Sequence, residues 1–545
     1  MSGRAGTLVC VPIMVEDVES ALADAARAHN LGADIVEFRL DRFFAGDEWQ
    51  GEACADLVAR SPIPCIATCR PAWEGGEYDG DEQERISLFE RLGTSDKPPA
   101  YIDVELAAYT RSANIRQKVN LSVRHPGQLR DGRPGLILSM HDFSGRPADL
   151  SRRVALAREQ PAASVIKVAY RARSLRDNLE LFDLIRDADR PMIALGMGEF
   201  GLMSRVLAPK FGAFLTFASL RDSGATAPGQ PTIEELLGLY RFREITRGTL
   251  VYGVMGWPVA QSLSPRLHNA AFSELGLDAL YLPLPVAASA DDEKATRASF
   301  TATLDALRAH AGLGFAGASV TIPFKEHLAQ FAESEGLDVP EAVRGCGAAN
   351  TIDVRRDAVA NTDLLAIHVL LTSELNDLKG KRVAVFGAGG AARAAAYACA
   401  AMGGATVHVF NRTGARAREL AAEMNATRND WDITIDARAL PRFGEDRYDA
   451  LVNCTPVGMS HGPDPDGVAI PLDRLKNPEQ TIVFDTVYNP VETPLIRAAR
   501  ERRLRVIDGL RMFTLQAAFQ VQFWASGTPD GPPLELYERV ARTHL

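Results

Sequence analysis

Arg382-Val-Ala-Val-Phe386, followed directly by Gly387-Ala-Gly-Gly-Ala-Ala392, is the stretch that decides the fold of the second half of the chain. Its apolar residues predict a short buried strand, and the alanine-rich residues after the glycines predict a helix. In this order Gly387 permits a tight turn, Gly389 lets a pyrophosphate approach the backbone, and Ala392 lets helix and strand pack closely. The stretch therefore predicts a dinucleotide site with the phosphates at the N-terminus of the helix.

The next strand-like run, Ala405–Phe410, leads into Asn411-Arg412-Thr413. A carboxylate at this point would bind the ribose 2′-hydroxyl of NAD, whereas an arginine suits the 2′-phosphate of NADP. An ordinary glycine-rich turn without a ligand is the alternative, and the strands on both sides make it the weaker one. We predict an NADP(H) site.

Composition limits the classes of protein to which the chain can belong. With 545 residues, 46% hydrophobic and 24% charged, it is typical of a soluble globular protein with several domains. The net charge of −10 argues against a nucleic-acid groove. Seven scattered cysteines without zinc-ligand spacing indicate a reducing compartment and no metal site. No apolar run is long enough for a membrane span, and the first strand-like run begins at Thr7, so we expect a cytoplasmic protein without a leader segment.

Up to about residue 220, short apolar runs alternate with helical patterns. Eight β/α repeats in about 240 residues predict a closed parallel (β/α)8 barrel. The polar, Arg-rich stretch 112–134 interrupts the pattern, because it predicts no clean amphipathic helix before the fifth strand, and we assign it no role. The eight expected strands are Leu8–Met14, Asp34–Leu40, Ile63–Cys69, Ala100–Leu106, Leu136–His141, Val165–Ala169, Pro191–Gly196 and Phe214–Ser219.

The Gly-, Ala- and Pro-rich segment Ser223–Gln230 and a new strand-like run from Gly248 place a domain boundary near residues 244–248. We expect an α/β fold throughout, with a (β/α)8 barrel over residues 1–244 fused to a two-lobed α/β dehydrogenase. Its substrate-binding lobe would span residues 248–372, completed by a C-terminal helix at 511–545. A Rossmann NADP-binding lobe would span residues 373–510.

Polar residues at the expected carboxyl ends of the barrel strands indicate a reactive site. A neutral Lys167 could form a Schiff base with a ketone, and His141 could then move protons on the activated carbon. Arginines 39, 70 and 205 suit a carboxylate substrate. Lys167 could instead pair with a carboxylate or snorkel, and His141 could be an ordinary core histidine. Their shared place at strand ends favours the reactive interpretation.

The motifs EFRLD (37–41), TCR…EGG (68–76), SMHDF (139–143), VIKVA (165–169), SR (204–205) and TAPGQ (226–230) resemble type I 3-dehydroquinate dehydratase. The resemblance implies that Lys167 forms an imine with the C3 ketone of 3-dehydroquinate. It implies that His141, oriented by Glu74, moves a proton from C2 to the departing C1 hydroxyl. Arg205 would bind the substrate carboxylate. The other implied substrate contacts are Glu37, Arg39, Arg70, Gln230 and Thr226, where bacterial members commonly have serine.

The region before the dinucleotide motif contains polar groups that fit the reduction of a ketone. A reductase needs a hydride donor and a proton donor near the carbonyl, and a lysine beside an aspartate can supply the proton. Lys325 and Asp363 are candidates for this pair. Each residue has a simpler alternative, because serine caps helices, a loop lysine is often solvated, and Asn, Thr and Asp occur in turns.

The motifs SxS, VTxPxK, ANT, NTD, GAGGAAR, NRT, NCTPVGM, DTVYNPVETPL and DGLRMFTLQA, in this order over about residues 249–545, resemble shikimate dehydrogenase. The resemblance implies Lys325 and Asp363 as the catalytic pair. The substrate contacts that it implies are Ser262, Ser264, Thr321, Asn350, Tyr488 and Gln516. The cofactor contacts that it implies are Gly387, Ala388, Gly389, Gly390, Ala391, Asn411, Arg412, Thr413, Thr455 and Gly509.

Taken together, the halves resemble the bifunctional dehydroquinate dehydratase–shikimate dehydrogenases. The resemblance implies dehydration of 3-dehydroquinate to 3-dehydroshikimate and its NADPH-dependent reduction to shikimate, on the way to chorismate and aromatic amino acids. Two alternatives remain open: side activity on quinate in the second half, and a non-catalytic sensor of quinate-pathway metabolites. We expect small-molecule substrates, no nucleic-acid or membrane partner, and a monomer or homodimer.

Overall fold

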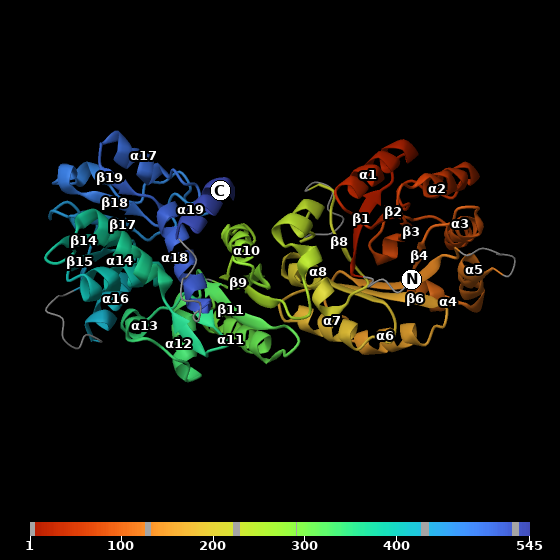
Figure 1. The fold of residues 1–545 in the computed structure, drawn as a ribbon, viewed down its shortest axis with the longest axis horizontal. Helices are drawn as coiled ribbons and strands as arrows, with labels where there is room; N and C mark the ends of the chain where they lie inside the picture. Colours follow the sequence, from red (N-terminus) through yellow and green to blue (C-terminus); the bar gives the residue numbers. More distant parts are fainter. Residues whose placement is uncertain are drawn as a thin grey trace. The chain divides into compact units, whose positions relative to one another are not determined.

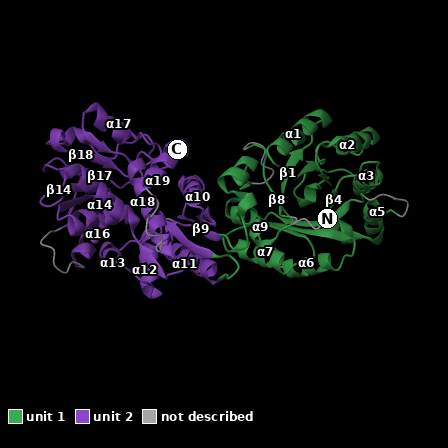
Figure 2. Ribbon diagram, in the orientation of Figure 1, with its two compact units in different colours: residues 1–249, 310–314 green, residues 250–309, 315–545 purple. Residues whose placement is uncertain are grey.

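The computed structural model describes residues 6–125, 132–221, 229–289, 291–426, 435–525 and 534–544. The chain forms two compact units (Figure 1, Figure 2). Unit 1 comprises Met1–Thr249 with His310–Gly314, and unit 2 comprises Leu250–Ala309 with Phe315–Leu545. Among these described ranges, no helix combines the length and apolar character that crossing a lipid bilayer requires.

Unit 1 is built on an eight-stranded parallel sheet with the order β7-β6-β5-β4-β3-β2-β1-β8. The backbone N–H of Phe214, just before β8, donates to the Met192 carbonyl of β7 at 2.8 Å, so the two ends of the sheet meet. The predicted barrel is confirmed, and the strand ends lie within about two residues of the expected ones because each apolar run is buried. The strands are β1 (Leu8–Met14), β2 (Ile35–Arg39), β3 (Cys65–Thr68), β4 (Tyr101–Glu105), β5 (Gly135–Asp142), β6 (Ala163–Arg171), β7 (Met192–Met197) and β8 (Leu215–Phe217).

Helices connect these strands, and one of them corrects the sequence analysis. Residues 113–124 form helix α5 rather than an irregular stretch. Ile115, Val119 and Val123 are buried at helical spacing, while the arginines lie on the other positions of the helix. The expectation that this part of the stretch lacks an amphipathic helix was therefore wrong. The helices are α1 (Val18–Asn30), α2 (Glu48–Arg60), η1 (Ala72–Glu74), α3 (Glu82–Thr94), α4 (Leu106–Arg111), α5 (Ala113–Arg124), α6 (Leu150–Arg158), α7 (Asp177–Arg186), η2 (Glu199–Gly201), α8 (Leu202–Val206), α9 (Ala208–Phe211), η4 (Glu235–Leu239) and η5 (Phe242–Glu244).

The first lobe of unit 2 contains a five-stranded sheet with the order β10-β9-β11-β12-β13. Strands β10, β9 and β11 run parallel, and β12 and β13 are antiparallel to their neighbours. The elements are β9 (Leu250–Gly256), α10 (Ser264–Glu274), β10 (Ala279–Pro285), α11 (Glu293–Ala309), β11 (Phe315–Val320), α12 (Lys325–Ser334), α13 (Glu341–Cys346), β12 (Thr351–Asp353), β13 (Ala358–Ala360) and α14 (Thr362–Leu375).

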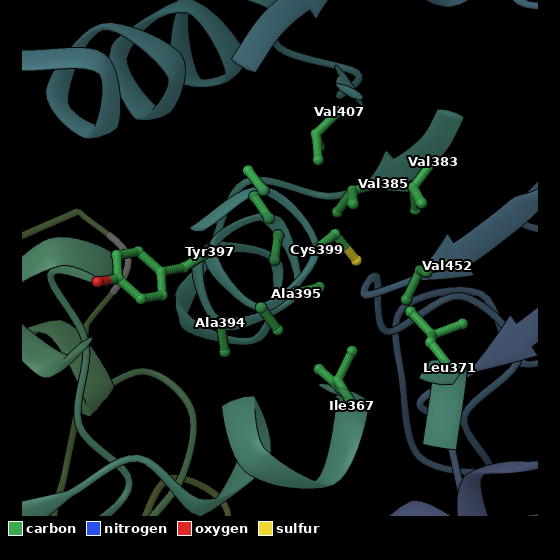
Figure 3. Packing of buried hydrophobic residues seen from close by; sticks show 14 of the residues in the cluster. Ile367, Leu371, Val383, Val385, Ala394, Ala395, Tyr397, Cys399, Val407 and Val452 are labelled. Atoms are coloured by element: carbon green, nitrogen blue, oxygen red, sulfur yellow. The ribbon is translucent and has the colours of Figure 1, made fainter. Parts of the chain in front are cut away.

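The second lobe is the predicted Rossmann fold, because its six parallel strands have the order β16-β15-β14-β17-β18-β19. Strand β14 is central, and helix α15 packs its alanines against Val383, Val385 and Val452 (Figure 3). Small side chains on α15 let helix and sheet approach closely. The elements are β14 (Arg382–Phe386), α15 (Gly390–Tyr397), η6 (Ala398–Met402), β15 (Thr406–Phe410), α16 (Gly414–Ala426), β16 (Ile435–Arg438), η7 (Leu440–Arg442), β17 (Ala450–Asn453), η8 (Leu472–Arg474), η9 (Pro478–Gln480), β18 (Ile482–Asp485), α17 (Pro494–Glu501) and β19 (Arg505–Ile507).

In the described part of the C-terminal region, two helices follow the Rossmann lobe, α18 (Gly509–Trp524) and α19 (Leu534–His544), where the sequence pattern predicted one. Both return to the first lobe of unit 2. Trp524 Nε1 donates to the Ile352 carbonyl at 3.0 Å, and Val521 and Tyr537 share a core with Tyr252 of β9. The chain therefore contributes its last helices to the lobe that precedes the dinucleotide-binding sheet.

Candidate active sites

Lys167 lies on the inner face of β6, between the buried residues Val165 and Ala169 of the barrel core. Its Nζ lies 2.9 Å from Asp103 Oδ2 and 3.5 Å from Glu37 Oε1. The Phe217 ring lies 4.7 Å from the same nitrogen. The amine is therefore held by two carboxylates in a site with an apolar wall.

Arg70 links this amine site to a further carboxylate, that of Glu105. Its Nη2 donates to Asp103 Oδ1 at 2.9 Å, and its Nη1 donates to Glu105 Oε1 at 2.5 Å and to Ser139 Oγ at 2.8 Å. Burial alone would favour neutral Asp103, but the charges of Arg70 and Lys167 hold the pKa of Asp103 well below its usual range. Arg70 thus already donates three hydrogen bonds, and a substrate would share its guanidinium with these carboxylates.

His141 lies one strand away from Lys167, since Ser139 pairs with Lys167 across β5 and β6 and His141 follows on the same face. Its Nδ1 is 3.1 Å from Glu74 Oε1, and its backbone N–H donates to the same oxygen at 2.9 Å. Burial raises the pKa of Glu74 to about 7, against the opposing charge of Arg70. Burial, with the charges of Arg70 and Lys167, holds the pKa of His141 well below its usual range. A neutral imidazole oriented by Glu74 can accept a proton.

The other predicted barrel residues have different surroundings. Arg205 of α8 is buried, and burial lowers its pKa to about 10; it forms no ion pair with any residue that the structure describes. It is thus suited to an incoming anion. Arg39 instead pairs with Asp41 through two contacts of 2.9 Å. Gln230 is buried, and Thr226 lies outside the described residues.

In unit 2, Lys325 Nζ donates to Asp363 Oδ2 at 2.5 Å. Lys325 begins α12, and Asp363 lies in the first turn of α14. Asn361 caps that turn by accepting from the Leu364 N–H, and Asn350 Oδ1 accepts from the Thr362 N–H at 2.8 Å. Asn350 therefore supports the turn that carries Asp363.

Several of the predicted substrate contacts of unit 2 hydrogen-bond to one another or to a neighbouring side chain. Ser262 Oγ accepts from the Ser264 N–H at 3.3 Å and also lies within hydrogen-bonding reach of Tyr488. Tyr488 stacks on Phe513 of α18 with ring centres 4.2 Å apart. Across the site, Thr362 Oγ1 donates to Gln516 Oε1 at 3.4 Å. The Thr321 N–H donates to the Met255 carbonyl at 2.9 Å, which fixes Thr321 at the end of β11.

The glycine-rich turn fits a dinucleotide. Gly387 has φ +120°, a conformation that favours glycine, and a Cβ there would lie 3.0 Å from the Cys454 carbonyl. Gly389 caps α15 without a side-chain hydrogen bond, and a Cβ on it would meet nothing within 4 Å. Ala388 precedes Gly389, and Ala391 follows Gly390. A Cβ on Gly390 would lie 2.7 Å from Lys325 Cβ, so the turn directly adjoins the proposed proton donor.

The other predicted cofactor contacts lie on the loops after neighbouring strands. Arg412 is exposed at the end of β15 and forms no ion pair within the described part of the chain, which fits a 2′-phosphate. Asn411 Nδ2 donates to the Thr413 carbonyl at 3.0 Å. Thr455 bonds to Asn453 Oδ1 through its N–H and hydroxyl. Gly509 begins α18, where a Cβ would lie 2.0 Å from the Val487 carbonyl, so this glycine permits close packing.

Sequence reasoning missed two polar side chains that the structure places in these sites. Ser139 lies between Arg70 and Asp103, and its hydroxyl donates to Asp103 Oδ1 at 2.6 Å. The two-residue period from His141 along the strand could have identified it. Tyr281 hydrogen-bonds Ser319 and reaches Ser264, and it gave no signal because a tyrosine in an apolar strand usually packs in the core. In the described ranges, no group of three or more His, Cys, Asp or Glu residues is arranged to hold a metal ion.

Comparisons with known proteins agree with this division of the chain. The family model of type I 3-dehydroquinase matches residues 9–247. The model of the shikimate dehydrogenase substrate binding domain matches residues 254–352, and the shikimate/quinate 5-dehydrogenase model matches residues 369–436.

Two relatives and one solved structure illustrate the similarity. The bifunctional 3-dehydroquinate dehydratase/shikimate dehydrogenase of Arabidopsis thaliana, a chloroplastic protein, is 36% identical over 98% of this chain and 84% of its own. The shikimate dehydrogenase (NADP(+)) of Methanocella arvoryzae is 38% identical over 54% of this chain and 99% of its own. The crystal structure of shikimate 5-dehydrogenase from Thermus thermophilus, in complex with NADP(H) and shikimate, is 31% identical, with a TM-score of 0.43, and covers 54% of this chain and 100% of its own.

Proposed function

The chain belongs to the family of bifunctional 3-dehydroquinate dehydratase/shikimate dehydrogenases, and on that basis we propose which of its residues carry out each reaction. It is a shikimate-pathway enzyme with a lyase unit and an NADP-dependent oxidoreductase unit. Unit 1 converts 3-dehydroquinate to 3-dehydroshikimate, and unit 2 reduces 3-dehydroshikimate to shikimate.

In unit 1, the Lys167 amine attacks the C3 ketone of 3-dehydroquinate, and loss of water gives an imine. The imine withdraws electrons from C2, so the C2 proton becomes acidic enough for neutral His141 to remove. Glu74 holds the imidazole in place through Nδ1. His141 then gives the proton to the C1 hydroxyl, which leaves as water, and hydrolysis of the imine releases the product and frees Lys167.

Arg205 is proposed to bind the substrate carboxylate, because it is buried and no described residue pairs with it. Glu37, which lies 3.5 Å from the amine, and Arg70, which shares Asp103 with it, are proposed to hold substrate hydroxyls. Arg39, Gln230 and Thr226 are proposed to complete the contacts. The pairing of Arg39 with Asp41 supports a fixed orientation for its guanidinium.

In unit 2, Lys325 protonates the oxygen of the reacting ketone, and Asp363 orients the Lys325 amine through their hydrogen bond. Ser262, Ser264, Thr321, Asn350, Tyr488 and Gln516 are proposed to bind substrate. The bound cofactor NADPH supplies the hydride. The backbone of the Gly387–Ala391 turn is proposed to hold the pyrophosphate of the cofactor. The 2′-phosphate is proposed to bind Asn411, Arg412 and Thr413. The remaining parts of the cofactor are proposed to contact Thr455 and Gly509.

The observation that carries the proposal is that each unit contains its own complete set of reacting groups: Lys167 with His141, and Lys325 with Asp363. A coupled assay tests it: the purified chain is given 3-dehydroquinate and NADPH, and shikimate is measured. We expect shikimate to form with both units intact. Lys167→Met should abolish it from 3-dehydroquinate but not from 3-dehydroshikimate, whereas Lys325→Met should abolish it from both. Equal loss in all four reactions would contradict the assignment of one reaction to each unit.

Quinate is a second candidate substrate for unit 2, because the model that matches residues 369–436 describes shikimate/quinate 5-dehydrogenases. The same assay in reverse, with quinate or shikimate and NADP+, measures the preference; we expect shikimate to react faster, since both Ser262 and Ser264 are present. We place the enzyme in the cytoplasm, as a monomer or homodimer. Its seven cysteines are all free, which supports a reducing compartment.

A further inference from the structure

Arg85 is a fully buried charged side chain of unit 1 that none of the roles above uses. It belongs to α3, a helix outside the barrel strands. Its Nη1 donates to the carbonyl of Cys69 at 2.8 Å and lies 2.9 Å from Glu105 Oε2. Its Nε and Nη2 donate to Glu82 at 3.0 and 2.8 Å. The guanidinium thus joins α3 to the carboxyl ends of β3 and β4.

Glu105 depends on Arg85 for charge compensation. Its side chain is completely buried, and Oε1 accepts a hydrogen bond from Arg70. Oε2 accepts no hydrogen bond from any described residue, so the adjacent Arg85 guanidinium supplies the positive charge beside it. A buried carboxylate with incomplete compensation is strongly destabilised.

These contacts form one chain of alternating charges that ends at the reacting amine. Arg85 adjoins Glu105, Glu105 adjoins Arg70, Arg70 adjoins Asp103, and Asp103 adjoins Lys167, with successive N–O distances of 2.9, 2.5, 2.9 and 2.9 Å. Each carboxylate in the chain lies between two cations. How strongly a carboxylate holds one of its two cations therefore depends on how strongly it holds the other.

We propose that Arg85 is a positioning residue for the dehydration: by compensating Glu105 it keeps Arg70 bridged to Asp103, and so limits how tightly Asp103 holds the Lys167 amine. The proposal rests on the imine mechanism of the previous section. Arg85 itself touches neither the substrate nor the reacting atoms.

The consequence of losing Arg85 follows from the chain of contacts. Glu105 would be left with Arg70 as its cationic partner, and Arg70 would be drawn toward Glu105 and away from Asp103. Asp103 would then pair more strongly with Lys167. An amine held as an ammonium ion cannot attack a ketone, so imine formation would slow and would require a higher pH.

Other groups also face the Lys167 amine, and substitution of Arg85 leaves them in place. Glu37 of β2 lies 3.5 Å from Nζ, and the Phe217 ring of β8 lies 4.7 Å from it. Cys10 of β1 and His141 of β5 interact with it electrostatically. The pKa of the Glu74 carboxyl also depends on the charges of Arg70, Glu105 and Asp103. Measuring Arg85→Met in a Glu74→Gln background therefore isolates the pH change that arises at the Lys167 amine through Arg70 and Asp103.

The experiment uses the full chain with Arg85→Met, Arg85→Lys and the double substitution Arg85→Met/Glu105→Gln. The kcat and KM for dehydration of 3-dehydroquinate are measured against pH, and the reductase rate of each sample serves as the reference for protein concentration. In Arg85→Met we expect kcat at pH 7 to fall by about tenfold, KM to change less than about threefold, and the midpoint of the pH profile to lie about one unit above the one that Glu74 sets in the wild type. The double variant should recover most of the loss, because glutamine removes the uncompensated charge. Arg85→Lys should lose about threefold, since one ammonium cannot reach all the partners of a guanidinium.

Several outcomes would overturn the proposal. One is a folded Arg85→Met protein with wild-type kcat and pH midpoint. Another is a double variant as slow as Arg85→Met, because the loss would then come from packing rather than charge. If Arg85→Met does not fold, the neutral polar variant Arg85→Gln takes its place: a folded Arg85→Gln protein with wild-type kcat and pH midpoint would show that the charge of Arg85 plays no part in the dehydration. Failure of the imine mechanism itself is distinct, since the wild-type chain would then form no borohydride-trapped adduct.

Discussion

The Nδ1 atom of His141 and the Oε1 atom of Glu74 lie 3.1 Å apart, and the same oxygen also accepts the backbone N–H of His141 at 2.9 Å. One carboxylate oxygen therefore fixes both the ring and the backbone of the proposed base. As a carboxylate, Glu74 accepts from Nδ1–H and leaves Nε2 free to take a proton; as a carboxylic acid it loses part of that capacity.

The dehydratase rate should consequently rise with pH through about 7, the value to which burial raises the pKa of Glu74. Glu74→Gln should remove this limb of the profile and lower kcat by about 10²-fold, as loss of an orienting group does. Glu77→Gln is the matched control, because Glu77 lies on the same loop but is exposed and pairs with Arg42. An unchanged limb in Glu74→Gln would show that another group titrates.

The same raised pKa predicts a cost in stability. A carboxyl group whose pKa rises on folding binds its proton more tightly in the folded state, so its contribution to the free energy of unfolding is lost as pH rises from about 4.5 to about 7. Glu74→Gln should therefore be more stable than wild type at pH 8, by up to about 3 kcal/mol, and similar at pH 4. Urea unfolding of the barrel at both pH values measures this difference. A variant less stable than wild type at pH 8 would contradict it.

Much of the fold could be predicted from the sequence, because a parallel strand buried on both faces is a continuous apolar run. Polar interruptions such as Lys167 and His141 then marked the strand ends. The dinucleotide turn was equally accessible, since Gly387 requires a conformation that favours glycine. The sequence could not show which group forms an ion pair with each buried charged side chain. Arg85 lies in a charged helical pattern typical of a solvated surface, yet it is buried against Glu105.

The reductase should depend on the charge of Asp363 rather than on its shape. Asp363→Asn keeps the volume but removes the carboxylate that lies 2.5 Å from Lys325 Nζ. We expect kcat for 3-dehydroshikimate reduction to fall by about 10²- to 10³-fold with a smaller change in KM. The dehydratase rate of the same sample is the control and should stay at the wild-type value. A rise in KM with an unchanged kcat would assign Asp363 to substrate binding instead.

Cofactor choice should depend on Arg412. Removing an exposed guanidinium that pairs with a phosphate should raise the KM for NADPH by about 10- to 100-fold in Arg412→Ala, while the KM for NADH stays within about twofold. Arg502→Ala removes an exposed arginine elsewhere in unit 2 and should change neither value. Equal effects of Arg412→Ala on both cofactors would remove the basis for the 2′-phosphate assignment.

The central claim is that the Lys167 amine, held between Asp103 and Glu37, bonds covalently to the substrate ketone. The most direct test is to add borohydride with 3-dehydroquinate and to map the modified peptide by mass spectrometry. We expect one adduct, on Lys167, with loss of dehydratase activity and full retention of reductase activity. Lys210, the other buried lysine in the described part of unit 1, donates to backbone carbonyls and should remain unmodified. Active protein that forms no adduct, or forms it on another lysine, would contradict the account.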